Sequence, residues 1–202
     1  MNGFKTTLIA LIALLALSGL APRVAANDDA ARLVERTAQE MLGALTERRA
    51  DIDRNPQLIY RLASDIVVPR FDFDLMTQAA VGRDWRAATP QQRAALIDGF
   101  RELLVRTYAT ALLKYAGEDI TVRAAQPGTR EGTVLVPTLV HLPGAAAIPI
   151  DYRLHQRDGT WRVYDVVIEN VSLISNYRNQ FRAIIERGGI DGLLAELQAK
   201  NP

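Results

Sequence analysis

The residues suited to acid–base chemistry are few and stand apart in the sequence. Asp72 and Asp74 are separated by one residue, so on a helix their carboxylates point in different directions. We expect them to cap or solvate a helix N-terminus rather than to act as a paired acid and base. Asp165, between Tyr164 and Val166 in a predicted strand, would be a general base if its pKa were raised. We expect it instead to be a structural hydrogen-bond acceptor.

The sequence also lacks the residues for thiol, metal and nucleotide chemistry. It has two histidines and no cysteine, which excludes cysteine nucleophiles and cysteine–histidine zinc sites. His141 and His155 fall in separate predicted strands with no visible third ligand, so we expect surface or rim positions for them. The sequence contains no Walker, GxSxG, HExxH or dinucleotide-binding motif. We therefore expect neither an enzyme nor a metal site.

The overall composition is that of a folded domain. The 202 residues are 49% hydrophobic and 23% charged, which is too apolar and too balanced in charge for a disordered chain. The 24 basic and 23 acidic side chains give a net charge of +1, whereas a nucleic-acid-binding domain is normally clearly basic. We expect no nucleic-acid partner.

The first 26 residues have the layout of a secretory signal peptide. Lys5 precedes the ten apolar residues Leu8–Leu17, and small residues up to Ala26 suit a signal peptidase. A membrane anchor is the alternative, but ten apolar residues are too short for roughly 30 Å of hydrocarbon. Cleavage after Ala26 would remove two basic residues and leave 22 basic and 23 acidic ones, a net charge of −1. We expect residues 27–202 to form one soluble, exported domain, periplasmic in a Gram-negative source.

Hydrophobic periodicity predicts helices in the first half of this domain. The strongest local signal is Thr89-Pro90-Gln91-Gln92, a capping box with proline in the first turn. It precedes an amphipathic stripe that ends before Gly117. The other predicted helices cover residues 28–50, about 56–67 with Asn55 as the N-cap, and about 71–82.

The periodicity then changes from helix to strand and back. The predicted strands are Ile120–Ala124, Gly132–Leu142, Ile148–Gln156 and Trp161–Glu169, separated by proline–glycine and aspartate–glycine pairs. A helix follows from Leu173, stops at Gly188-Gly189, and is followed by a last short helix. The predicted fold class is α+β, with N-terminal helices, an antiparallel curved sheet of about four strands and C-terminal helices.

The predicted helices and strands contain more apolar residues than one buried face of each element requires. The long helix contains Leu103-Leu104-Val105 and Ala111-Leu112-Leu113, and the strands add further runs. A well-packed core is one explanation, and the wall of a cavity for an apolar ligand is the other. The pattern alone does not separate them.

Seven short runs of residues carry a family resemblance. They are Arg70–Met76, Gly82–Trp85, Arg106–Tyr108, Trp161–Val166, Glu169–Leu173, Asn176–Arg178 and Gly188–Leu193. In this order they resemble the MlaC family, also called the toluene-tolerance family, over about residues 28–197. Asn170 departs from the pattern, because the family often has a glycine there.

The resemblance implies a periplasmic phospholipid carrier with a nuclear-transport-factor-2-like fold. Such a carrier exchanges lipid between an outer-membrane lipoprotein–porin complex and an inner-membrane ABC transporter with an MCE-domain ring, and so maintains outer-membrane lipid asymmetry. It implies no cofactor, since the phospholipid is cargo, and we expect a monomer. The acyl chains would occupy an apolar pocket while the head group stays near solvent.

The residues that we expect to line this pocket are chosen by apolar face. They are Phe73, Met76, Phe100, Leu104, Tyr108, Val136, Leu139, Ile150, Tyr152, Val167, Val171, Ile174 and Tyr177. Two other hypotheses stay open: an enzyme on the same fold that uses Asp165 or Tyr164, and a protein–protein adaptor that binds no lipid. Five basic residues either form part of a basic rim or are scattered and solvated, namely Arg83, Arg86, Arg106, Lys114 and Arg178.

Overall fold

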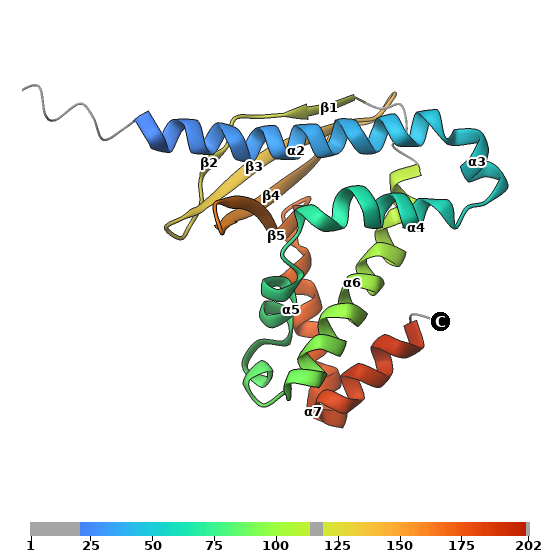
Figure 1. Cartoon of the computed structure of the whole chain (residues 1–202), viewed down its shortest axis with the longest axis vertical. Coiled ribbons are helices and arrows are strands. Elements are labelled where there is room, and N and C mark those ends of the chain that lie inside the picture. Colours follow the sequence, from blue (N-terminus) through green and yellow to red (C-terminus); the bar gives the residue numbers. More distant parts are fainter. Residues whose placement is uncertain (1–20, 114–118, 201–202) are drawn as a thin grey trace, which may run out of the picture.

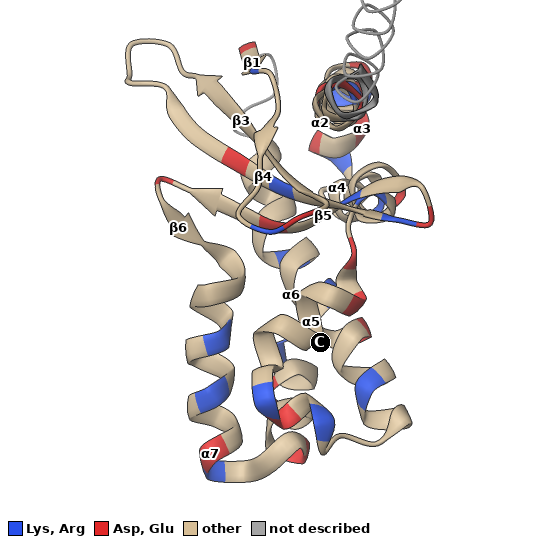
Figure 2. Cartoon of the chain, turned by 90° about the vertical axis from the view of Figure 1, so that its left-hand side faces the viewer, with Lys and Arg blue, Asp and Glu red and all other residues tan. Residues whose placement is uncertain are grey.

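A twisted antiparallel sheet separates one long N-terminal helix from a layer of three helices (Figures 1 and 2). This computed structural model describes residues 21–113 and 119–200, with side chains from residue 27 onward. The apolar run of the predicted signal peptide and Lys114 lie outside the described residues. The α+β class and the order of helices, sheet and helices are confirmed.

The N-terminal helices follow the predicted order. They are α2 (Ala21–Glu47), α3 (Arg49–Arg54) and α4 (Leu58–Leu62), continued by a π-helical turn η1 (Ala63–Val67) and a 3-10 turn η2 (Val68–Arg70). The prediction that a helix begins at Pro56 is wrong by two residues. Asn55 Oδ1 accepts a hydrogen bond from Gln57 N–H at 3.2 Å, and the Asn55 carbonyl accepts one from Leu58 N–H at 3.0 Å. Asn55 therefore makes the predicted N-cap bond, but the backbone bonds of this first turn join residues three apart, so the α-helix itself begins at Leu58.

The two predicted helix starts in the next segment are confirmed. Asp72 caps α5 (Phe73–Val81), because its carboxylate accepts a hydrogen bond from Leu75 N–H at 2.9 Å. Helix α5 ends at Gly82, whose φ of 73° favours glycine, and the 3-10 turn η3 (Gly82–Arg86) follows. Thr89 and Gln92 form the predicted capping box of α6 (Pro90–Leu112).

Four of the strands correspond to the predicted ones. They are β1 (Asp119–Val122), β3 (Thr133–His141), β4 (Ile148–Arg157) and β5 (Thr160–Ile168). Two short strands extend the sheet: β2 (Gln126–Pro127) pairs with β3, and β6 (Val171–Ser172) pairs with β5. The order β1-β3-β4-β5-β6 is antiparallel, with β1 and β2 along one edge and β6 at the other.

The tight turn between β5 and β6 explains the departure at Asn170. Glu169 and Asn170 have φ angles of 49° and 67°, and asparagine tolerates this left-handed region better than most residues that carry a side chain. Asn170 therefore takes the conformation that a glycine would take there, and β6 pairs directly back onto β5.

The C-terminal segment α7 (Leu173–Lys200) contains the predicted break. Gly189 has φ 66° and ψ −166°, which separates a first helix that packs on α5 and α6 from a second that carries Leu193 and Leu197. Both of these leucines are buried. The prediction of two C-terminal helices with a stop at Gly188-Gly189 is confirmed.

Apolar side chains are buried in three clusters. The first lies within the helical layer of α5, α6 and α7, and the second joins α2, α3, α4 and η1 to α6. The third packs Ala30 and Val34 of α2 against one face of β3, β4 and β5. Over residues 21–113 and 119–200, no helix has the length and apolar character needed to cross a bilayer.

Candidate functional site

The helical layer brings together seven of the thirteen residues predicted to line a pocket. Five of them are buried in one cluster, and Phe73 and Tyr108 pack against its edge. Phe100 of α6, with none of its surface exposed, packs edge-on against Tyr177 and Phe181 of α7, with 5.1 Å between ring centroids in both cases. The five buried members are Met76, Phe100, Leu104, Ile174 and Tyr177.

A pair of tyrosines is the polar feature of this apolar cluster. Tyr108 of α6 and Tyr177 of α7 hydrogen-bond to each other through their side chains. Burial raises the pKa of Tyr108 to about 12, and the proximity of Tyr177 adds to the effect. Tyr177 is one turn beyond Ile174, whose N–H is bonded to Asp165 of β5, so the pair belongs to the end of the helical layer that adjoins the sheet.

The sheet residues of the predicted lining divide between its two faces. Val136 pairs with Tyr152, and Ile150 pairs with Ile168. All four pack in the cluster under α2, on the face away from the helical layer. Within that cluster, burial raises the pKa of the Tyr152 hydroxyl.

Leu139 and Val167 lie on the opposite face, toward the helical layer. Leu139 pairs with Pro149, and Val167 pairs with Asp151 and Ser172. The residues of β3 on this same face include Leu135 and Pro137, which the prediction did not select. Side chains alternate between faces along a strand, so odd and even positions of β3 cannot line one wall. That alternation, applied strictly, identifies Leu135 and Pro137 as companions of Leu139.

Val171 of β6 stands apart from both groups. It is 57% exposed, the exposed large hydrophobic side chain of the described residues. It follows the Glu169–Asn170 turn at the edge of the sheet. A valine side chain in this position is available to a ligand without any change in the core.

A buried carboxylate ties α5 to the sheet. Asp72 is 4% exposed and contacts His155 Nε2 at 2.9 Å and Arg157 at 3.1 Å, both on β4, while its own N–H donates to Val163 O of β5 at 2.8 Å. Burial raises the pKa of Asp72, but the Leu75 N–H bond, the Arg157 charge and His155 together outweigh it and lower that pKa below its ordinary value. His155 is therefore a partner of Asp72 rather than a free rim residue.

A second buried carboxylate ties α7 to the sheet. Asp165, 3% exposed, accepts hydrogen bonds from Arg153 at 2.9 Å, from Ser172 Oγ at 2.7 Å and from Ile174 N–H at 3.2 Å. Ser172 Oγ in turn accepts from Ser175 N–H in the first turn of α7. The prediction that Asp165 is a structural acceptor is confirmed by these contacts. Asp72 and Asp165 are the buried acidic residues of the described chain, and each joins a helix to the sheet.

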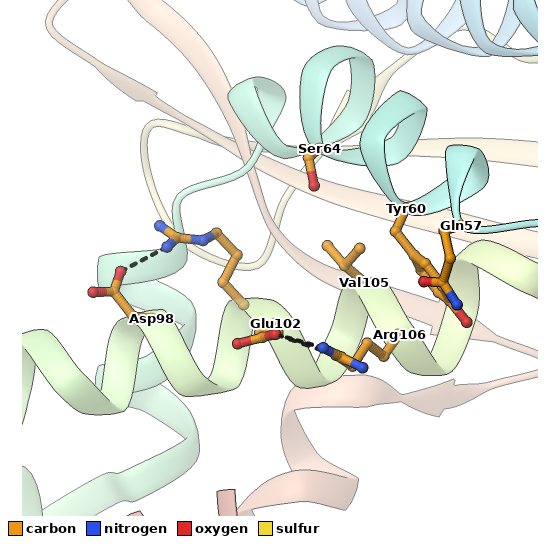
Figure 3. Close-up of a pocket in the computed structure, with 8 residues that line it drawn as sticks. Gln57, Tyr60, Ser64, Asp98, Glu102, Val105 and Arg106 are labelled. Atoms are coloured by element: carbon orange, nitrogen blue, oxygen red, sulfur yellow. Dashed lines mark hydrogen bonds and ion pairs between the residues drawn. The ribbon is translucent and has the colours of Figure 1, made fainter. Parts of the chain in front are cut away.

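A pocket of about 410 Å³ between α4, η1 and α6 differs from the apolar clusters in its lining (Figure 3). Figure 3 shows Gln57, Tyr60 and Ser64 on one side, opposite Glu102 and Arg106, which are bonded to each other at 3.0 Å. Its lining is largely polar and contains none of the predicted pocket residues. A second pocket of similar size, by the N-terminus of α5, includes Phe73 of that set.

The basic residues proposed as a rim are distributed over η3, α6 and α7, mostly in local contacts. Arg106 pairs with Glu102, Arg83 lies 3.8 Å from Asp84, and Arg178 donates to the Ala79 carbonyl at 2.7 Å. Among the residues that the structure describes, no group of three or more His, Cys, Asp or Glu side chains is placed to hold a metal ion.

The structure is an α+β domain in which the buried carboxylates of Asp72 and Asp165 join a curved sheet to an apolar helical layer. The family model for the MlaC protein matches residues 35–199, so the chain belongs to the MlaC family. This confirms the resemblance that the sequence runs indicate.

Individual relatives agree with this assignment. The chain is 29% identical over 162 residues to the toluene tolerance protein Ttg2D of Pseudomonas putida, covering 79% of this chain and 74% of the relative. It is 21% identical over 169 residues to the intermembrane phospholipid transport system binding protein MlaC of Haemophilus influenzae, covering 82% and 79%. A phospholipid-binding protein from Ralstonia solanacearum, solved in complex with a phospholipid, matches with a TM-score of 0.78 and 33% identity over 86% of this chain and 97% of the other.

Proposed function

We propose that the protein is a phospholipid carrier that holds acyl chains between its sheet and its helical layer. The observation that carries this proposal is the similarity to the Ralstonia protein in complex with a phospholipid, which extends over almost the whole of that chain. The names of the Haemophilus and Pseudomonas relatives are consistent with it.

A phospholipid needs a carrier in water because exposing its acyl chains costs much free energy. Two acyl chains contain about 28 methylene groups, and exposing them to water costs on the order of 20 kcal/mol at roughly 0.8 kcal/mol each. A carrier that crosses an aqueous space must enclose them. An apolar wall does this without a catalytic group, and it discriminates little between chain lengths.

The proposed site lies where the helical layer meets the sheet face that carries Leu139 and Val167. On the helical side it is bounded by Tyr108 and Ile174. Val171 pairs with Ile168, which packs under α2, so Val171 lies at the sheet edge on the other face. The packed helical cluster and the sheet face thus contribute opposite walls. Val136, Ile150 and Tyr152 lie under α2, so their part in the proposed lining requires α2 to move.

The expected cellular setting completes the proposal. Residues 1–26 would be removed on export, and the protein would act in the periplasm. There it would receive and deliver phospholipid at an inner-membrane MCE-domain ABC transporter and an outer-membrane lipoprotein–porin complex, and so maintain lipid asymmetry. The direction of net transport is set by the energy source of these partners.

Native mass spectrometry of protein purified from its own periplasm tests the proposal. We expect an intact mass that exceeds that of the chain by about one phospholipid, and extraction should release that lipid. An empty protein with a packed interior would contradict carriage and favour a protein–protein adaptor. Loss of a chemical activity in Asp165→Asn with unchanged lipid content would favour an enzyme.

A further inference from the structure

The connection between β3 and β4 is an uncharged apolar tip. From Leu142 to Ile150 the chain reads LPGAAAIPI, nine residues without a charged or hydrogen-bonding side chain. Residues 143–146 are exposed, and Ala145 N–H donates to the Leu142 carbonyl at 3.3 Å to close the turn. Figure 2 shows the end of this hairpin in tan, projecting away from the helical layer.

The exposed Val171 belongs to the same end of the sheet. Glu169 N–H, in the turn before Val171, donates to the Pro149 carbonyl at 3.1 Å. Ile168, the partner of Val171, pairs in turn with Ile150 at the start of β4. We call residues 142–149 together with Val171 the apolar tip. Val171 is linked to the base of this hairpin through Ile168 and Ile150, while the exposed residues 143–146 project beyond it.

The apolar tip continues into the proposed lipid site. Pro149 pairs with Leu139, which lies on the sheet face directed toward the helical layer. An acyl chain that passed over the tip would therefore meet the uncharged β3 side chains of the sheet wall, beside Asp151 of β4 on the same face. The tip therefore lies where an acyl chain would enter the proposed site.

The composition of the tip distinguishes between possible occupants. Protein interfaces are enriched in aromatic residues, Met and Arg and depleted in Ala, whereas the tip has three alanines and none of the enriched types. A stable dimer buries about 800 Å² on each partner, roughly 20 residues a side, and the tip is a single short turn. The tip lacks the side chains that fix a protein partner, whereas its uninterrupted apolar surface suits contact with a lipid phase.

We propose that the apolar tip inserts shallowly into the surface of a phospholipid bilayer when the protein takes up or delivers its cargo. This inference rests on the proposed carrier function. Insertion stops at the boundary between head groups and acyl chains, because the turn leaves backbone amides and carbonyls that still need water. Asp119, Asp151 and Glu169 flank the tip, so attraction to anionic head groups is not the driving force.

A tryptophan placed in the tip tests insertion directly. We would add phosphatidylcholine vesicles with brominated acyl chains to Ala145→Trp protein and to a control, Ala95→Trp, at an exposed position of α6. We expect a blue shift and bromine quenching at position 145, beyond the signal of the two native tryptophans, and neither at position 95. Equal signals in the two variants would overturn the proposal. This readout needs no bound cargo, so it is independent of the carrier function.

Charges placed in the tip test its use in transfer. The double variant Ala145→Asp, Ala146→Asp is compared with Ala94→Asp, Ala95→Asp, which places the same two charges on exposed positions of α6. We expect the tip variant to transfer lipid between phosphatidylcholine vesicles about tenfold more slowly, because carboxylates resist insertion, while its co-purified lipid and melting temperature are unchanged. Unimpaired vesicle transfer, or a defect seen only with a partner protein, would overturn the proposal. Lipid absent from both variants and from the wild type would instead remove the carrier function.

Discussion

Asp72 and His155, 83 residues apart in the chain, are joined by a contact of 2.9 Å between Oδ2 and Nε2. The same carboxylate caps α5 and meets Arg157. One buried side chain therefore fixes the start of a helix to the middle of the sheet. Asp165 does the same for α7 through Ser172 and Ile174. Because the proposed site lies between these layers, the two aspartates set the distance across which its walls face each other.

The lowered pKa of Asp72 predicts a loss of stability in acid. The unfolded chain binds the proton of this carboxyl more readily than the folded protein does, so stability rises with pH through this range. The contribution is fully present above the ordinary aspartate pKa of about 3.9 and is lost as the pH falls through the lower, folded pKa. Urea unfolding at a series of pH values measures this slope.

We expect Asp72→Asn to flatten that slope and to lower the free energy of unfolding near neutral pH by about 1–3 kcal/mol. Asparagine retains an oxygen for Leu75 N–H but loses the charge that faces His155 and Arg157. Asp74→Asn is the control, because Asp74 is exposed and shares only the Arg157 contact. If the free energy of unfolding changed with pH in parallel for the wild type and Asp72→Asn, the pH dependence would come from groups other than Asp72.

The raised pKa of Tyr108 predicts a loss of stability in alkali. Folded Tyr108 keeps its proton up to a pKa of about 12, whereas an unfolded tyrosine ionises near pH 10. The folded state therefore holds more protons between these values, and its stability falls as the pH rises through them. Tyr108→Phe should reduce this fall and cost about 0.5–1.5 kcal/mol at neutral pH through the lost hydrogen bond. Phenolate absorbance during alkaline titration should lose a late-titrating group in the variant; an unchanged late phase would contradict the assignment.

The Asp165 anchor predicts a structural effect without loss of a chemical activity. In Asp165→Asn only one side-chain oxygen remains to accept hydrogen bonds from three donors, and the new NH₂ group faces one of those donors. We therefore expect the free energy of unfolding to fall by about 2–3 kcal/mol. Ser172→Ala removes one donor to Asp165 and the bond from Ser175 N–H, with a smaller expected loss of about 1 kcal/mol. Urea denaturation of both variants and of the double variant measures the coupling. Strictly additive losses would mean that the two side chains do not act as one anchor.

Local signals explain which parts of the fold the sequence predicts. The capping box of Thr89 and Gln92 and the break at Gly189 depend on neighbouring residues, so both are found at the predicted positions. The start of α4 is displaced by two residues because the backbone hydrogen bonds of the turn after Asn55 join residues three apart. Pairs such as Asp72 and His155 depend on the register of a sheet relative to a helix layer, which no local pattern encodes.

The candidate site is predicted less completely, for a related reason. Apolar character identifies side chains that avoid water but not the layer in which they are buried. Val136 and Leu139 are both apolar, yet they lie on opposite faces of β3 because they are three positions apart. The contrast between a packed helical cluster and an exposed Val171 likewise appears only once the chain is folded.

Val171 is the member of the predicted lining that can be changed without disturbing the core. Because 57% of the side chain is exposed, Val171→Glu should fold with unchanged stability, so any loss of bound phospholipid reports on the ligand rather than on the core. Leu104→Glu places the same charge at a buried position of the helical layer and should lose lipid together with several kcal/mol of stability, on the order of 3 kcal/mol or more. Val171→Thr is the matched control, since it keeps the shape of the side chain without a charge. Lipid extraction and native mass spectrometry measure occupancy, and thermal unfolding measures stability. If Val171→Glu and Leu104→Glu both retained full occupancy, the pocket would lie outside the walls proposed for it.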